Sequence, residues 1–537
     1  MVKAYVGIDI GTTYTCAYYT LENGLSGYVF TGEMNAIRTA VYYKSDREKV
    51  IGDAAISPGR IVTGNVVMNV KRVIGKKRDS ERVKKAAESC KATICDDEDK
   101  YAAFTIPSLN RVVKAEEVYM DIINYVWEEV TKKLEDYDIK CVTITCPTMY
   151  KSGERAAIIR AVQNSRINCE WRLLSEPCAA AISFENDIER DGLYAIYDMG
   201  GGTYDVSLVL VKDGKYFDFI ASDGDPDMGG QVFDDLLVTH VNTLFYENFH
   251  DHIFDENDKD RKRYLHNLSQ LSERCRKAKE ALSSEEFTDI DIEEFQIDYL
   301  NHVDENENDE GGLYAFMDNV KLTRVQFEEK IKGNIDKSVQ ILEKCVREKG
   351  KSITDIRSVF LVGGSSCIPL IEKKLKKVFG DRCRNCRNPN TAVAIGASKY
   401  AMKQELNEVT FTQYAQHDIF AEYEKHHHIA YDVFIRKGEK LPVRVEKEYK
   451  VKAKETEGYY KDKFYEGLIN QAEMRSRLKT FEYFDLPQMT CILKYVMEME
   501  EDGTLYCTII LQGDHDRVIH PRSRIDKNNV HQIYVQE

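Results

Sequence analysis

Residues 6–19 read VGIDIGTTYTCAYY, and residues 194–209 read YAIYDMGGGTYDVSLV. Each stretch is an apolar strand that ends in an aspartate, then a turn of glycine and threonine, then a second strand. The two aspartates, Asp9 and Asp198, take equivalent places in the two stretches. A strand–turn–strand unit that occurs twice predicts two related lobes, each of which contributes one hairpin to a shared site.

The chemistry of this turn indicates what such a site binds. Glycine has no Cβ, so the backbone can turn tightly and come close to a ligand. The N–H groups then point into the turn and form a concavity that suits an anion. An aspartate beside a phosphate would repel it unless a divalent cation lay between them, and oxygen ligands favour Mg²⁺. One such hairpin is as often an ordinary tight turn, but two predict a triphosphate and its metal between the lobes.

Composition excludes several classes of protein. The chain has 537 residues, 43% of them hydrophobic, and a formal net charge of −15, so we expect two to four domains and neither nucleic acid nor an anionic membrane as a partner. The opening residues MVKAYVGIDIGTT lack the apolar stretch of a secretory signal, and no apolar run approaches the roughly 20 residues that cross a bilayer. Fourteen cysteines without framework spacing suit a reducing compartment. We therefore expect a soluble, cytoplasmic protein.

Up to about residue 400, short β-rich runs alternate with amphipathic helical stretches. Residues 140–147 and 358–364 read as strands, and residues 153–165 and 368–380 read as helices. This alternation predicts the α/β class. The acidic stretch DENENDE at 304–310 is interpreted as an exposed loop, with a docking site for a basic partner as the alternative.

After about residue 403 the pattern becomes that of a β domain. Partly alternating strands are joined by turns, and EEDGTL at 500–505 predicts a hairpin in which Asp-Gly supplies the positive φ angles. The predicted organisation is a nucleotide-binding domain over 1–403, with lobe I about 1–190, lobe II about 191–380 and a return helix to 403, then a linker over 404–418 and a β sandwich over 419–537.

Seven motifs together resemble a known family. VGIDIGTTYTC, VKRVIG, LLSEPCAAAISF, YDMGGGTYDVS, MGGQVFDD, AKEALSS and VFLVGGSSCIPLI have the order and spacing seen in the seventy-kilodalton heat-shock chaperones of the DnaK type. The resemblance covers residues 4–401, and the β region after 419 is more faintly similar to the client-binding sandwich of that family. It implies a two-lobed actin-like ATPase domain, duplicated from a ribonuclease-H-like unit, followed by a β sandwich.

The resemblance also implies roles for individual residues. Lys71 would reach the γ-phosphate, Glu176 and Asp198 would orient the attacking water with Thr203 beside it, and Asp205 would support the loop. Taken alone, Lys71 could be a surface lysine, Glu176 the end of a strand and Asp205 a strand-edge acid. Asp9 and Asp198 would hold Mg²⁺ largely through its waters. The implied nucleotide-binding set is Gly11, Thr12, Thr13, Tyr14, Gly200, Gly201, Gly202, Thr203, Gly230, Lys279, Ser283, Gly363, Gly364, Ser365 and Ile368.

The sequence departs from the family where the nucleoside would lie. Arg276 replaces a glutamate, Glu280 and Cys367 replace the two arginines that stack on adenine, and Asn390 replaces an aspartate. A carboxylate and a thiol stack poorly on a base. Losing both guanidinium groups should cost about 1–3 kcal/mol, so we expect ATP to bind more weakly or in a different arrangement.

Communication with the β domain is the second departure. Pro147 and Arg155 match the family's relay from nucleotide to linker, but VTFTQYAQHDI at 409–419 lacks the expected run of leucines ending in aspartate. The sequence also stops at Glu537, where the family continues into a helical lid, so we expect a sandwich that releases peptides quickly.

Two clusters of metal-binding residue types are set aside. Cys383 and Cys386 form a single CxxC without a second pair at zinc spacing. His426, His427 and His428 are adjacent, and on a strand their side chains would alternate between faces. No metal beyond Mg²⁺ is implied.

The leading functional hypothesis is a divergent chaperone that hydrolyses ATP to ADP with Mg²⁺ and binds unfolded polypeptide, with co-chaperones as possible partners. The alternative is a nucleotide-sensing regulator or exchange partner of another chaperone, with little hydrolysis. A small-molecule kinase on the same fold is disfavoured because sugar kinases lack the appended β domain.

Overall fold

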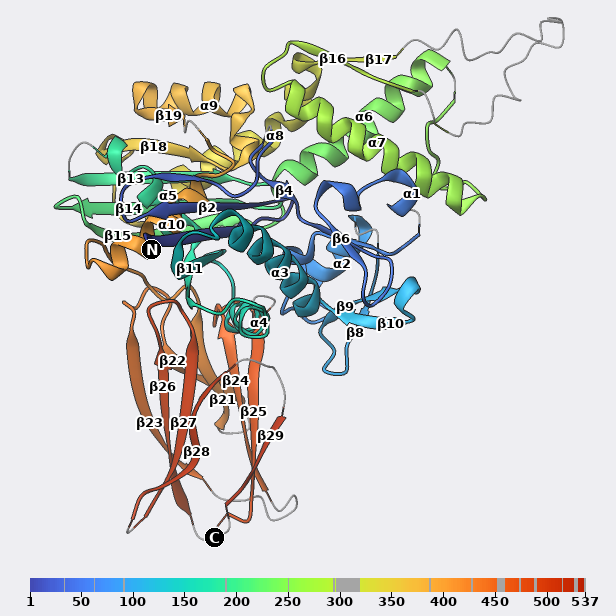
Figure 1. Cartoon of the computed structure of the whole chain (residues 1–537). Coiled ribbons are helices and arrows are strands. Elements are labelled where there is room, and N and C mark those ends of the chain that lie inside the picture. The colour runs from blue at the N-terminus through green and yellow to red at the C-terminus, as the bar shows by residue number, and fades with distance from the viewer. Residues whose placement is uncertain are drawn as a thin grey trace, which may run out of the picture.

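The chain folds into a two-lobed α/β region followed by a β-rich C-terminal region (Figure 1), which confirms the predicted fold class. None of the helices among the described residues has the length and apolar character needed to cross a membrane. This computed structural model describes residues 1–32, 34–61, 63–89, 92–188, 191–249, 251–292, 295, 319–385, 388–425, 428–451, 459–472, 475–486, 490–513, 515–525 and 530–535.

The two lobes are built around sheets of the same topology. The first sheet has the order β12-β11-β1-β2-β3, and the second has the order β19-β18-β13-β14-β15. In each, the first hairpin is antiparallel and its leading strand pairs in parallel with a later strand. The duplication predicted from two turns therefore extends over both sheets.

The strands of the first lobe are β1 (Lys3–Ile10), β2 (Tyr14–Leu21), β3 (Ser26–Tyr28), β4 (Ile37–Arg38), β11 (Asp138–Cys146) and β12 (Glu170–Ser175). Those of the second lobe are β13 (Gly192–Met199), β14 (Tyr204–Lys212), β15 (Tyr216–Asp225), β18 (Ile356–Val362) and β19 (Cys383–Asn385). Peripheral strands are β5 (Ala40–Tyr43), β6 (Lys49–Ile51), β7 (Val66–Met68), β8 (Thr93–Asp96), β9 (Ala102–Ile106), β10 (Arg111–Lys114), β16 (Phe287–Ile290) and β17 (Val320–Thr323).

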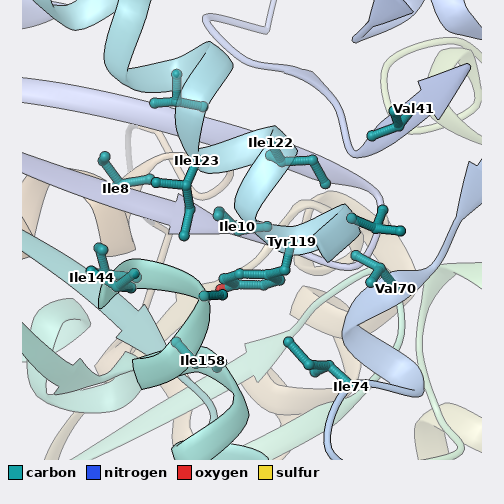
Figure 2. Close-up of a cluster of buried hydrophobic side chains, with 14 of the residues drawn as sticks. Ile8, Ile10, Val41, Val70, Ile74, Tyr119, Ile122, Ile123, Ile144 and Ile158 are labelled. Atoms are coloured by element: carbon teal, nitrogen blue, oxygen red, sulfur yellow. The ribbon is translucent and has the colours of Figure 1, made fainter. Parts of the chain in front are cut away.

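Helices cover and join these sheets. In the first lobe, α3 (Ala115–Lys133) directs Tyr119 and Ile123 toward Ile8 of β1 and Ile144 of β11, and all four side chains are buried (Figure 2). The remaining helices are α1 (Pro58–Ile61), α2 (Glu81–Ser89), α4 (Ser152–Gln163), α5 (Glu176–Ser183), α6 (Gly230–Phe249), α7 (Arg261–Ala281), α8 (Arg324–Glu348), α9 (Pro369–Phe379) and α10 (Ala392–Glu405).

Helices α5 and α10 connect the lobes. Helix α10 packs on β1 and β2 of the first sheet and on α5. Alanines of α5 and α10 also share a buried cluster with Ile196 of β13 and Phe360 of β18, in the second sheet. The lobes thus meet across two helices whose facing residues are small.

The C-terminal region contains two sheets around one hydrophobic core. One has the order β22-β21-β24-β25-β29, and the other has the order β23-β26-β27-β28. Ahead of them, β20 (Thr410–Thr412) pairs in parallel with β15 at the edge of the second lobe. The strands are β21 (Asp418–Lys425), β22 (His428–Ile435), β23 (Val443–Val451), β24 (Tyr459–Gly467), β25 (Ser476–Phe484), β26 (Cys491–Met499), β27 (Leu505–Gln512), β28 (Arg517–Arg524) and β29 (Val530–Tyr534).

One prediction about this region is wrong in detail. The hairpin at 500–505 exists, but of the Asp-Gly pair only Gly503 has a positive φ, of 79°. The reason is loop length, since the strands end at Met499 and resume at Leu505, and a longer loop needs one left-handed residue rather than two. The acidic stretch 304–310, Cys386, His426 and His427 lie outside the described residues.

Candidate functional site

The two glycine hairpins face each other and touch. Each is closed by the same backbone bond, from Gly11 N to Tyr14 O at 2.9 Å and from Gly200 N to Thr203 O at 3.0 Å. A Cβ on Gly201 would lie 2.2 Å from Thr13 Oγ1, in the opposite hairpin. Only glycine permits this approach, so the repeated motif brings the two lobes together at one point.

Lys71 lies beside these hairpins in a short 3-10 helix, Val70–Arg72. Its ammonium group is 2.6 Å from Glu176 Oε1 and 3.9 Å from Asp9 Oδ1, and the residue is only 7% exposed. Burial alone would lower the pKa of Lys71. The charges of Glu176 and Asp9 outweigh burial and raise the pKa, so the side chain stays protonated. Thr145 Oγ1 donates to Asp9 Oδ1 at 2.7 Å and fixes that carboxylate.

The buried carboxylates of the site raise one another's pKa values. Burial, opposed by Lys71, raises the pKa of Glu176 to about 7, with Asp9 adding to the rise. Burial also raises the pKa of Asp198 well above its usual value, and the charges of Glu176, Asp205 and Asp9 add to it. The pKa of Asp205 is raised by burial, against a hydrogen bond from Thr203. The site therefore has an excess of buried negative charge.

This charge excess is what a divalent cation would relieve. Among the described residues, no three histidine, cysteine or acidic side chains are grouped as a ready-made metal cage. Mg²⁺ typically uses one or two carboxylates and completes its shell with water and substrate phosphates. Asp9 and Asp198 fit that mode of binding.

One cavity of about 390 Å³ collects nearly all of the predicted residues. Gly230 does not line it but supports its wall, because its N–H donates to Gly200 O at 3.0 Å. Ser365 Oγ donates to the same carbonyl at 2.9 Å. The predicted residues that line the cavity are Asp9, Gly11, Thr12, Thr13, Tyr14, Lys71, Pro147, Glu176, Asp198, Gly200, Gly201, Gly202, Thr203, Asp205, Lys279, Ser283, Gly363, Gly364, Ser365 and Ile368.

The four departures from the family pattern line the same cavity: Arg276, Glu280, Cys367 and Asn390. Lys279, one of the residues implied for nucleotide binding, forms a 2.7 Å ion pair with Asp234 and donates to Gly230 O at 3.0 Å. A ligand at this end would meet a lysine that already has partners.

Several residues near the site were missed from the sequence, and three of them bond directly to predicted site residues: Arg72, Thr145 and Tyr150. Arg72 Nη2 donates to Gly202 O at 3.1 Å, and the Tyr150 hydroxyl donates to Lys71 O at 2.5 Å. The only sequence signal was the position of Arg72 next to Lys71. The other two belong to β11 and the loop after it, which pack on the site from far along the chain.

The β-rich region contacts the first lobe at the end of this loop and at the first turn of α4. Ser152 N donates to Glu466 Oε2 at 2.9 Å, and Lys151 Nζ donates to Ser476 Oγ at 2.6 Å. Arg155 Nη1 donates to Asp502 O at 2.7 Å. These bonds join the end of that loop and the first turn of α4 to the C-terminal region.

Comparison with known families agrees with the architecture. The family model described as Hsp70 protein matches residues 5–421, more than half of the chain, and ends before most of the C-terminal region. Proteins of this family are chaperone-type ATPases that generally bind ATP or ADP with Mg²⁺. The duplicated sheets, the paired glycine hairpins and this match lead to one conclusion: the chain belongs to the Hsp70 family, within the actin-like ATPase superfamily.

Proposed function

We propose that the chain is a divergent Hsp70-type chaperone that binds ATP with Mg²⁺ and hydrolyses it slowly, with residues 419–537 binding extended polypeptide. The observation that carries the proposal is the buried ion pair of Lys71 and Glu176, in the cavity that the two glycine hairpins also line. An ion pair buried this deeply is costly to build for stability alone.

Different residues of the site would bind the phosphates, stabilise charge during phosphoryl transfer and orient water. The hairpin N–H groups would receive the phosphates, and Lys71 would offset the charge that builds up during phosphoryl transfer. Glu176, Asp198 and Thr203 would orient the attacking water. Mg²⁺, when bound with the phosphates at Asp9 and Asp198, would supply positive charge against the phosphate oxygens.

The test is turnover of Mg-ATP by the full chain. Lys71→Ala should lower the rate by roughly 10²–10³, the usual cost of removing one charge-stabilising donor. The matched control is Lys84→Ala, which removes an exposed lysine whose partner is Glu81 on the same helix. Equal rates in the wild type and in Lys71→Ala would contradict the assignment.

Coupling of ATP turnover to the C-terminal region is supported by contacts between the two regions rather than by the sequence of the linker. The loop after β11 bonds to Lys71 through Tyr150, and the first turn of α4, which follows that loop directly, bonds to the β region through Ser152 and Arg155. An unfolded peptide added to the assay should therefore change the turnover rate, and Arg155→Ala should remove that change while leaving basal turnover measurable.

A second candidate function is favoured by the rearranged nucleoside end, where Arg276 and Glu280 replace the usual residues. It is a nucleotide-sensing regulator or exchange partner of another chaperone. It predicts nucleotide binding with negligible hydrolysis and a stable complex with a conventional chaperone. Pull-downs that recover unfolded clients but no chaperone would exclude it.

A further inference from the structure

Five side chains form a clasp at the end of the cavity where the family resemblance places the nucleoside, and three of them, Tyr14, Arg276 and Glu280, line the cavity. Tyr14 and Arg38 come from the first lobe, and Glu273, Arg276 and Glu280 come from α7 in the second. Arg276 is at the centre, with Nη1 2.6 Å from the Tyr14 hydroxyl and 2.7 Å from Glu280 Oε2. The clasp links the lobes with the chain's own side chains.

The clasp is completed by a second arginine. Arg276 Nη2 and Nε donate to Glu273 at 2.6 and 3.1 Å, and Arg38 Nη1 donates to the same carboxylate at 3.1 Å. The Tyr14 hydroxyl donates to Glu280 Oε1 at 3.1 Å. The ring of Tyr14 has both guanidinium groups over it, with Arg38 Cζ at 5.5 Å and Arg276 Cζ at 5.9 Å from its centre.

These groups are largely committed to one another. Arg38 and Arg276 are 5% and 9% exposed. Burial raises the pKa of Glu273, but the two arginines outweigh burial and hold the pKa below its usual value. A base that recruited Arg276 would have to break buried ion pairs, and the cost of leaving such partners unpaired cancels the gain.

The end of the cavity that the glycine hairpins line has a different set of polar groups. There the glycine hairpins present backbone N–H groups, and the Lys71 ammonium group, which has three donors, hydrogen-bonds to Glu176 and lines the same cavity. Binding selectivity should therefore come from the phosphates and their metal and hardly at all from the base.

On the basis of the function proposed above, we infer that this site recognises a magnesium-bound polyphosphate and is nearly indifferent to the nucleobase, because the clasp of Tyr14, Arg38, Glu273, Arg276 and Glu280 occupies the interactions that would read it. ATP, GTP, CTP and UTP should bind alike. Inorganic tripolyphosphate should bind as well.

Calorimetric titration of the full chain with each of these five ligands, in Mg²⁺, tests the inference. We expect the four nucleotides to agree within about fivefold in Kd and tripolyphosphate to fall within about tenfold of ATP. A preference for ATP over the other nucleotides of fiftyfold or more would overturn the inference and leave the proposed ATPase function standing. Failure of every ligand to bind would overturn both.

A charge-swapped variant makes the role of the clasp explicit. Arg276→Glu with Glu280→Arg keeps an ion pair at i,i+4 but puts a guanidinium where it can stack on a base. The ratio of ATP to tripolyphosphate affinity should rise at least tenfold. Lys277→Gln, an exposed position on the same helix, is the control and should leave the ratio unchanged. An unchanged ratio in a charge-swapped variant with wild-type circular dichroism would count against the inference.

Discussion

Glu176 is the residue whose chemistry depends most on its surroundings. It begins α5, forms a 2.6 Å ion pair with Lys71, and has a pKa raised to about 7 by burial and by Asp9. A carboxyl with a raised pKa is protonated below that value and ionised above it. It can therefore accept a hydrogen bond from water as an anion only on the alkaline side of about pH 7.

We accordingly expect kcat/KM for Mg-ATP to rise between pH 6 and pH 8, because this parameter reports groups of the free enzyme. Glu176→Gln should lower turnover by roughly 10²–10⁴ and remove the rise. Glu170→Gln, an exposed carboxylate on β12, is the control and should keep the wild-type profile. A profile in Glu176→Gln that matches the wild type would contradict the role given to this residue.

At the scale of elements, the contact between α5 and α10 decides where Glu176 lies. Gly396 of α10 approaches α5 so closely that an added Cβ would be 1.7 Å from the carbonyl oxygen of Ala179. A backbone oxygen cannot move aside as a flexible side chain can. Any side chain at 396 must push α5 away, and Glu176 moves with it.

Gly396→Ala should therefore destabilise the chain by about 1–3 kcal/mol, as overpacked cores do. It should lower turnover more than it lowers nucleotide affinity, because it displaces Glu176 relative to Lys71. Urea unfolding and steady-state kinetics measure the two effects. Gly333→Ala is the matched control, since nothing lies within 4 Å of its Cβ in the middle of α8, and it should be neutral or stabilising by about 0.5–1 kcal/mol.

Elements that depend on local pattern were predictable from the sequence. Both glycine hairpins were predictable because consecutive residues determine the turn. Helix α9 was predictable from its periodic apolar face, and the structure buries Leu370, Ile371, Leu375 and Phe379. Contacts such as Tyr150 with Lys71 and Thr145 with Asp9 were not, since they join residues 79 and 136 positions apart and leave no periodic signal. The family pattern gave the substitutions Arg276 and Glu280, but the bonds that they form with Tyr14 required the structure.

At the scale of the whole molecule, one of the contacts that hold the C-terminal region to the first lobe is made by a buried carboxylate. Glu466 of β24 is 3% exposed and accepts the backbone N–H of Ser152, the first residue of α4. An acid at a helix N-terminus is favourable, and this one comes from another part of the chain. Its protonation is therefore linked to docking of the two parts.

The sign of that linkage follows from the shifted pKa. Burial, with Glu154 adding to it, raises the pKa of Glu466 to about 7 from the ordinary value of 4.5, against the bond from Ser152 and the charge of Lys151. The docked form thus binds a proton more tightly than an undocked, solvated Glu466 would. Docking is favoured at low pH and loses this contribution as the pH rises through about 7.

Between pH 6 and pH 8 the docking equilibrium should weaken by about tenfold, the linkage expected for one group with this pKa. Hydrogen exchange of a peptide that contains the Ser152 amide, corrected for the intrinsic pH dependence of exchange, measures the change directly, because that amide is the donor to Glu466. Glu466→Gln keeps an acceptor but cannot titrate, so its protection should be the same at both pH values, whereas Glu448→Gln, an exposed position on β23, should behave as the wild type. If Glu466→Gln retained the tenfold change, another group would govern docking, and the carboxylate would serve only as a cap for α4.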